Sequence, residues 1–148
     1  MRRQQLLIWA AWLVYVAAWF LPIVKEGVTL PDGLPGWQAF RLATCAVWSC
    51  ADISIDKWHK TALFTTSAVT TLLFVPGSVW AVWGGSRALR RASAWIATLA
   101  FVVNAHWYVL YGDSAREDLR IGYFLWWLSF LLLALGPFDL SRPEAGKR

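Results

Sequence analysis

Long apolar runs separated by short clusters of charge dominate the chain. Residues 6–24 (LLIWAAWLVYVAAWFLPIV) and 61–83 (TALFTTSAVTTLLFVPGSVWAVW) hold no Asp, Glu, Lys or Arg, and the same is true of residues 92–111 and 121–135. A run of about 20 apolar residues is long enough to cross a bilayer as an α-helix. The pattern therefore predicts an all-α fold in which residues 1–148 form one integral-membrane domain, a bundle of four transmembrane helices.

Prolines and glycines punctuate these runs. Pro76-Gly77 is expected to kink the second span, with Ser or Thr hydroxyls or neighbouring helices satisfying the freed carbonyl. Gly136-Pro137 is expected to stop the fourth helix. The start, MRRQQ, is similar to the first part of a signal peptide, and Val16-Ala17-Ala18 is a conceivable cleavage site. Because the apolar run continues to Val24, we favour an uncleaved first helix.

Residues 36–50 (GWQAFRLATCAVWSC) are apolar but include Arg41. If this segment also crossed the membrane, the chain would have five spans. Arg87, Arg90 and Arg91 would then lie on the opposite side from MRRQQ, against the tendency of basic loops to remain in the cytoplasm. About 15 residues is also too short for a comfortable crossing. We therefore expect residues 36–50 to form a short interfacial or re-entrant helix in the first outer loop.

The four-span arrangement separates the charges by sign. The inner side then holds eight basic and two acidic residues, a sum of +6, and the outer side six basic and seven acidic residues, a sum of −1, which together give the chain's net charge of +5. This distribution predicts a multi-pass protein of a bacterial inner membrane with both termini cytoplasmic. The inner set is Arg2, Arg3, Arg87, Arg90, Arg91, Arg142, Lys147, Arg148, Asp139 and Glu144. The outer set is Lys25, Arg41, Lys57, Lys60, Arg116, Arg120, Glu26, Asp32, Asp52, Asp56, Asp113, Glu117 and Asp118.

Composition agrees with a membrane location. Hydrophobic residues make up 58% of the chain and charged residues 16%, and the mean hydropathy is +0.46. The twelve tryptophans suit the membrane–water interface, where an indole ring meets both lipid and water. No basic run is interleaved with aromatic residues in an RNA-binding arrangement, so we expect no nucleic-acid partner.

Three short motifs carry a resemblance. The first helix ends in AAWFLPIV, GWQAF follows a Gly/Pro turn, and the last helix begins IGYFLWWLSF. Together they resemble a broad group of small bacterial four-helix inner-membrane proteins, in which a Phe-Leu-Pro sequence precedes Gly-Trp-x-Ala-Phe and the last helix opens with Gly-Tyr-x-x-Trp. The resemblance implies a fold and a location, and no activity.

Cys45 and Cys50 are the only cysteines, and the expected topology places both outside. They form a possible disulfide, although residues five apart on a continuous helix point in different directions. The layout is similar to that of quinone-linked disulfide oxidases, but those have a Cys-x-x-Cys pair and a second pair. Two unbridged thiols, a structural disulfide and thiol–disulfide or haem/quinone-linked redox chemistry all remain open.

His59, Asn104 and His106 form a possible polar site near the outer membrane face. Two histidines without carboxylates make a weak metal signal, so we expect neither a metal nor a cofactor. The favoured interpretation is an interfacial histidine and an interhelical hydrogen bond from Asn104. A small channel or carrier subunit is a further alternative, although no charged residue lies deep within a span.

The outer loops carry mixed charges and aromatic side chains, and loops on a rigid scaffold often carry recognition. We therefore predict no enzyme activity and expect the protein to act through lipid bilayer contacts or a protein partner at its outer face. Small four-helix immunity proteins share this layout, which suggests an immunity or accessory role. The candidate partner-facing residues are Trp37, Phe40, Arg41, Asp52, Asp56, Lys57, Trp58, Arg116, Glu117 and Asp118.

Overall fold

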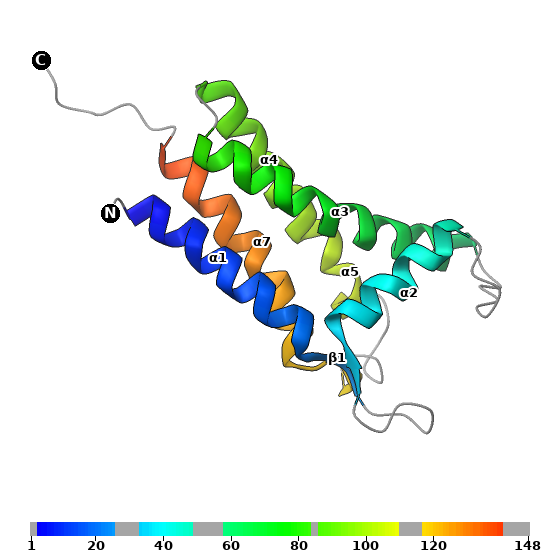
Figure 1. Cartoon of the computed structure of the whole chain (residues 1–148). Coiled ribbons are helices and arrows are strands. Elements are labelled where there is room, and N and C mark those ends of the chain that lie inside the picture. The colour runs from blue at the N-terminus through cyan, green and yellow to red at the C-terminus, as the bar shows by residue number, and fades with distance from the viewer. Residues whose placement is uncertain (1–2, 26–32, 49–57, 84–85, 110–116, 141–148) are drawn as a thin grey trace, which may run out of the picture.

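The computed structural model describes residues 3–25, 33–48, 58–83, 86–109 and 117–140 (Figure 1). Its long helices are α1 (Arg3–Phe20), α3 (Trp58–Trp83), α4 (Arg87–Asn104) and α7 (Ile121–Leu140). The shorter elements are α2 (Gly36–Trp48), α5 (His106–Val109) and the strands β1 (Pro22–Val24) and β2 (Leu34–Pro35), which pair antiparallel as a hairpin.

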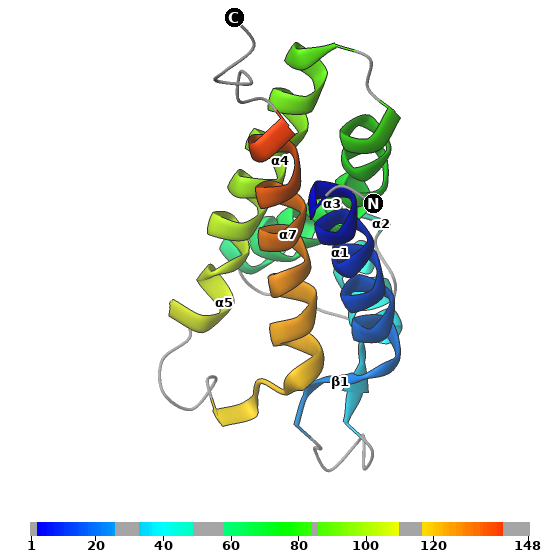
Figure 2. The same cartoon turned by 90° about the vertical axis from the view of Figure 1, so that its left-hand side faces the viewer.

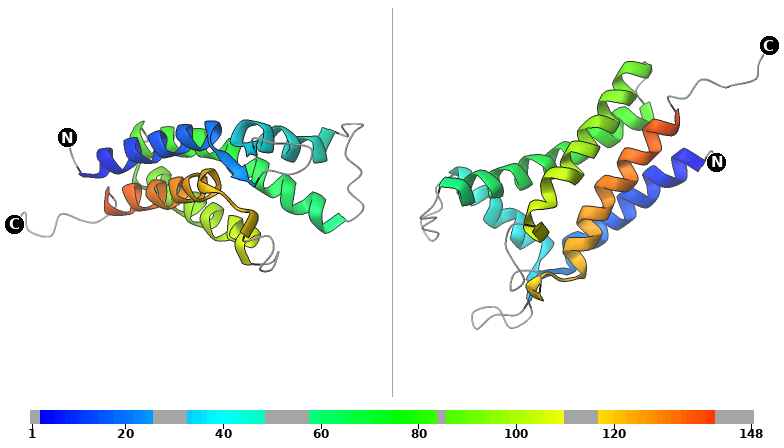
Figure 3. Two further views of the ribbon diagram at one scale, coloured as in Figure 1. Left: turned by 90° about the horizontal axis from the view of Figure 1, so that it is seen from below. Right: turned by 180° about the vertical axis from the view of Figure 1, so that it is seen from behind.

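The long helices form a bundle in which α7 packs against α1 on one side and α4 on the other. Helix α3 packs against α4, and α2 lies along α3. The start of α1, the end of α7, the end of α3 and the start of α4 lie at one end of the bundle. The hairpin and α5 lie at the other end, which we call the hairpin end (Figures 1 and 2). Helices α1 and α3 diverge towards the hairpin end (Figure 3).

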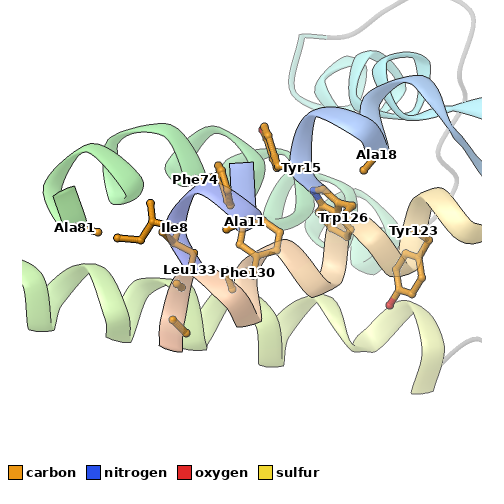
Figure 4. Packing of buried hydrophobic residues seen from close by; sticks show 13 residues of the cluster. Ile8, Ala11, Tyr15, Ala18, Phe74, Ala81, Tyr123, Trp126, Phe130 and Leu133 are labelled. Carbon is orange, nitrogen blue, oxygen red and sulfur yellow. The ribbon is translucent and has the colours of Figure 1, made fainter. Parts of the chain in front are cut away.

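Buried residues recur every three or four positions along each long helix, which is the spacing of a helix–helix seam. The ring of Phe74 from α3 stacks on Tyr15 of α1, with centroids 4.0 Å apart, and meets Phe130 of α7 edge to face at 5.7 Å (Figure 4). The seams of α1 and α7 consist of Ile8, Ala11, Tyr15 and Ala18 and of Tyr123, Trp126, Phe130 and Leu133.

The faces that point away from this core are also apolar. Leu13 on α1 is 73% exposed, Leu99 on α4 is 64% exposed and Leu72 on α3 is 60% exposed. A helix that is hydrophobic all round is typical of a membrane or of the core of a much larger protein. Within the described residues, one helix, Ala62–Trp83, is long and apolar enough to cross a membrane by length and composition. The apolar stretches Gln5–Phe20 and Ile121–Gly136 are shorter.

The expectation of an all-α fold is confirmed, apart from the short hairpin, and a helix begins at Gly36 as expected. The first helix ends at Phe20 and residues 22–24 form a strand, so the boundary at residue 24 was wrong. The cause is Pro22, because the residue before a proline is disfavoured in the α conformation. The expected third span of residues 92–111 is divided between α4 and α5.

The two internal prolines lie within helices. Helix α7 continues to Leu140, so the predicted stop at Gly136-Pro137 was wrong. Pro137 falls in the last turn, where it removes a single backbone hydrogen bond. Helix α3 likewise continues through Pro76, and beside it the hydroxyl of Ser93 in α4 donates to the carbonyl of Gly77 at 2.6 Å. This inter-helix bond lies next to Pro76, but it is made to Gly77 and not to the carbonyl of Leu72, which is the one that Pro76 leaves without its helical partner.

Candidate functional site

A tight joint at the hairpin end brings together segments that are far apart in the sequence. The backbone N–H of Gly36 donates to the carbonyl of Leu21 at 3.2 Å. A Cβ atom on Gly36 would lie 2.8 Å from the Cα of Trp19, and one on Gly122 would lie 2.7 Å from the carbonyl oxygens of Leu21 and Pro22. Only glycine permits these approaches. The joint therefore holds the end of α1, the start of α2 and the start of α7 in fixed relative positions.

The hairpin is also tied to the segment that precedes α7. The N–H of Lys25 donates to the carbonyl of Asp118 at 2.7 Å, and the N–H of Arg120 donates to the carbonyl of Ile23 at 2.8 Å. Val24 and Leu119 form an antiparallel bridge. Backbone hydrogen bonds therefore join the strand that follows α1 to the segment that precedes α7.

A cavity of about 350 Å³ lies next to this joint, between α1, the hairpin, α2, α3 and α7. Its walls are almost entirely apolar. The helices α1 and α3 diverge at this end, and α2 lies across the space between them (Figure 1). Several of the residues that line the cavity are small. Its lining consists of Ala18, Trp19, Ile23, Val24, Leu34, Gly36, Ala39, Phe40, Leu42, Ala43, Phe64, Ser67, Ala68, Thr71, Trp107, Leu119, Tyr123 and Trp126.

Three residues with hydroxyls line the cavity, and each hydroxyl is already hydrogen bonded within the protein. Ser67 donates to Oδ1 of Asn104 at 3.0 Å and accepts from the indole N–H of Trp107 at 2.9 Å. Thr71 donates to the carbonyl of Ser67 at 2.7 Å. The hydroxyl of Tyr123 donates to the backbone carbonyl of Asn104 at 2.9 Å. All three hydroxyls of the lining are therefore hydrogen bonded within the protein.

Asn104 is fully buried at the end of α4 and connects three helices. Its amide nitrogen donates to the hydroxyl of Thr70 in α3 and to the carbonyl of Ala100, each at 2.8 Å. The expected interhelical hydrogen bond from Asn104 is therefore confirmed. Since Ser67 and Thr70 both bond to Asn104, the Ser/Thr face of α3 is used for packing against α4.

His106 is buried at the start of α5, and its Nδ1 donates to the carbonyl of Val103 at 2.6 Å. Its Nε2 has no hydrogen-bond partner within the described part of the chain. The side chain of His59 lies outside the described residues, so a site shared by the two histidines stays a prediction. Among the described residues no group of three or more His, Cys, Asp or Glu side chains could hold a metal ion.

The candidate partner-facing residues divide between the surface and the cavity. Trp37 is 45% exposed, and Arg41, Glu117 and Asp118 are also exposed. Phe40 is half-buried and packs on Trp19, with ring centroids 5.2 Å apart, so it belongs to the cavity wall. Asp52, Asp56, Lys57, Arg116, Cys50 and the side chains of Trp58 and Cys45 lie outside the described residues.

The cavity itself was not predicted from the sequence. The available signal was the spacing of small residues: Ala39 and Ala43 lie four apart on α2, so they share one helix face. Nothing in the sequence alone showed that Ala68 of α3 would lie opposite them. The motifs GWQAF and IGYFLWW nonetheless contribute Gly36, Phe40, Tyr123 and Trp126 to this one cavity.

No family model, curated protein or solved structure matches this chain. The resemblance carried by the three motifs therefore stays a prediction.

Proposed function

We propose that the chain is a multi-pass membrane protein in which α1, α3, α4 and α7 all cross the bilayer, and that it acts through lipid or protein contacts at the hairpin end. The observation that carries the proposal is the apolar outer surface of all four helices. Leu13, Leu72, Leu99 and Leu128 are exposed on α1, α3, α4 and α7 respectively. In water such a surface would drive aggregation, whereas lipid tails cover it without cost.

The ends of the bundle support an orientation. Arg87 and Arg91 are exposed at the end shared with the start of α1, and the hairpin end carries Lys25 and Arg120 together with Glu117 and Asp118. A basic end and a mixed end favour placing the former in the cytoplasm of a bacterial inner membrane. Both termini would then be cytoplasmic, and α2, the hairpin and the cavity would lie in the outer half.

Reporter fusions test this topology. A reporter that is active only in the cytoplasm is fused after Arg91 or Arg148 and, separately, at Asp52 or Ser114. We expect activity from the first two fusions and none from the others, because an odd number of spans separates any site of the first set from any site of the second. A reporter that is active only outside the cytoplasm serves as the matched control and must give the reverse pattern. Cytoplasmic activity at Asp52 would contradict the four-span arrangement.

A further inference from the structure

We infer that the cavity at the hairpin end binds a hydrocarbon chain of a membrane amphiphile, either an acyl chain or a polyprenyl chain. This inference rests on the proposed membrane location and adds the class of ligand. The volume of the cavity, about 350 Å³, lies within the range of roughly 300–1,000 Å³ that is common for small-molecule sites. Three properties of the cavity and its surroundings favour a hydrocarbon chain as the ligand.

The first property is the chemistry of the lining. Ser67 and Thr71 already donate to Asn104 and to a backbone carbonyl, and the indole N–H of Trp107 already donates to Ser67. A carbonyl of a ligand inside the cavity would lose its hydrogen bonds to water and find these three donors already in use. The almost entirely apolar lining therefore favours hydrocarbon over a quinone ring or the edge of a haem that carries propionates.

The second property is that the cavity is held open by backbone geometry. Gly36 cannot move closer to α1, because its backbone already touches the chain at Ala18 and Trp19. The bonds from Lys25 and Arg120 fix the hairpin on the other side. A void that cannot collapse loses dispersion contacts along its whole surface, so an apolar occupant stabilises it. The surrounding bilayer supplies hydrocarbon chains at high concentration.

The third property is the position of the charged groups. Lys25, Arg41 and Arg120 are exposed, and each is next in sequence to residues that line the cavity, namely Val24, Phe40 or Leu42, and Leu119. A chain that enters the cavity therefore has exposed charged residues close by along the backbone, where its headgroup can stay in a polar environment. This separation of an apolar interior from a charged border matches an amphiphile.

Photolabelling of the full-length protein tests the inference. The protein is reconstituted into vesicles of phosphatidylethanolamine and phosphatidylglycerol that contain a phospholipid with a diazirine in its acyl chain. In a second set the probe is a polyprenyl phosphate with a diazirine in its chain. We expect labelled peptides from the cavity walls formed by α2 and by residues 64–71, and the better probe identifies the source of the chain.

Two variants make the test specific. Ala68→Phe fills the cavity, while Val69→Phe, the matched control, places the same ring on a neighbouring position that is 47% exposed. We expect labelling of the cavity walls to fall about tenfold in Ala68→Phe. The ring takes up space that the bound chain would fill, and excluding about two methylenes of that chain from the cavity weakens binding by this factor. Val69→Phe should label like the wild type. Circular dichroism and gel filtration check the fold, and Ala43→Phe, which fills the cavity from α2, is used if Ala68→Phe does not fold.

The outcomes separate the two proposals. If the protein does not remain with the vesicles and no peptide is labelled, the membrane proposal fails. If exposed positions such as Leu99 are labelled and the cavity walls are not, the hydrocarbon site is overturned while the membrane location stands. Equal labelling of the walls in the wild type and in folded Ala68→Phe would also overturn it. So would a change of oligomeric state in Ala68→Phe without loss of labelling, because a second copy would then occupy the cavity.

Discussion

Gly36 and Gly77 show how the same residue type has different consequences at different places. A Cβ atom on Gly36 would lie 2.8 Å from the Cα of Trp19, and closer still to the carbonyl of Ala18. Both neighbours are backbone atoms, so relief requires α1 and α2 to separate. A Cβ atom on Gly77 would meet nothing closer than the hydroxyl of Ser93 at 3.9 Å, which is ordinary van der Waals contact.

We therefore expect Gly36→Ala to destabilise the protein by about 1–3 kcal/mol, the usual cost of overpacking. Gly77→Ala should be neutral or should stabilise α3 by about 0.5–1 kcal/mol, because alanine restricts the unfolded chain. Thermal unfolding in a mild detergent, followed by circular dichroism, measures both. Equal melting temperatures for the two variants would contradict the close contact at Gly36.

Asn104 offers a second test at the scale of single residues. Asn104→Leu removes the hydrogen bonds to Ser67, Thr70 and the carbonyl of Ala100. We expect a loss of about 0.6–1.7 kcal/mol, the measured range for such bonds inside membranes. Thr98→Ala is the control, since the hydroxyl of Thr98 bonds only within its own helix, to Ala94. Melting temperatures of the two variants that are indistinguishable would rule out a stabilising role for the Asn104 network.

At the scale of elements, the length of the apolar runs predicted the four long helices, and a short apolar segment predicted the helix that begins at Gly36. The pattern failed where a single residue overrides it. Pro22 ends α1 early and directs the chain into a strand, whereas Pro137 is tolerated in a last turn. The hairpin itself was missed, because its pairing between residues 22–24 and 34–35 is a contact between segments and leaves no local period.

The cavity was missed for a related reason. Ala39, Ala43 and Ala68 suit close helix packing equally well, so nothing local distinguishes a cavity lining from an ordinary packed interface. The two aromatic residues that α2 contributes to the predicted partner-facing set lie in different surroundings. Phe40 packs on Trp19, while Trp37, three residues earlier, is 45% exposed.

The orientation of α2 predicts a pattern of chemical accessibility. Single cysteines at Trp37, Arg41 or Ala43, in a background with Cys45→Ser and Cys50→Ser, are treated in intact cells with a membrane-impermeant thiol reagent. Positions 37 and 41 should react quickly because both are exposed, and position 43 should be protected because Ala43 is 6% exposed. Uniformly fast labelling at all three positions would mean that the segment is a free loop.

At the scale of the whole molecule, the bundle is apolar on both its inner and its outer surface. The inner surface is explained by packing around Phe74. The outer surface has no partner among the described residues, and its exposed side chains occur on every long helix. A protein in water normally separates polar and apolar residues between surface and core. In this bundle the apolar residues are not confined to the core. A single substitution on the outer surface can therefore show whether lipid or water surrounds the helices.

Leu13 is the best position for this test, because it lies near the middle of α1 and is 73% exposed. Leu13→Asp touches little of the core, so in water it would be neutral or would improve solubility. In a bilayer, the same charge at mid-helix costs about 2.5–3.5 kcal/mol. We therefore expect Leu13→Asp to lower the amount of protein in the membrane fraction, while Leu13→Phe, the matched control, keeps it. Quantitative immunoblotting of membrane and soluble fractions measures the difference. A Leu13→Asp variant that accumulates in the soluble fraction as a folded protein would show that lipid does not cover this surface.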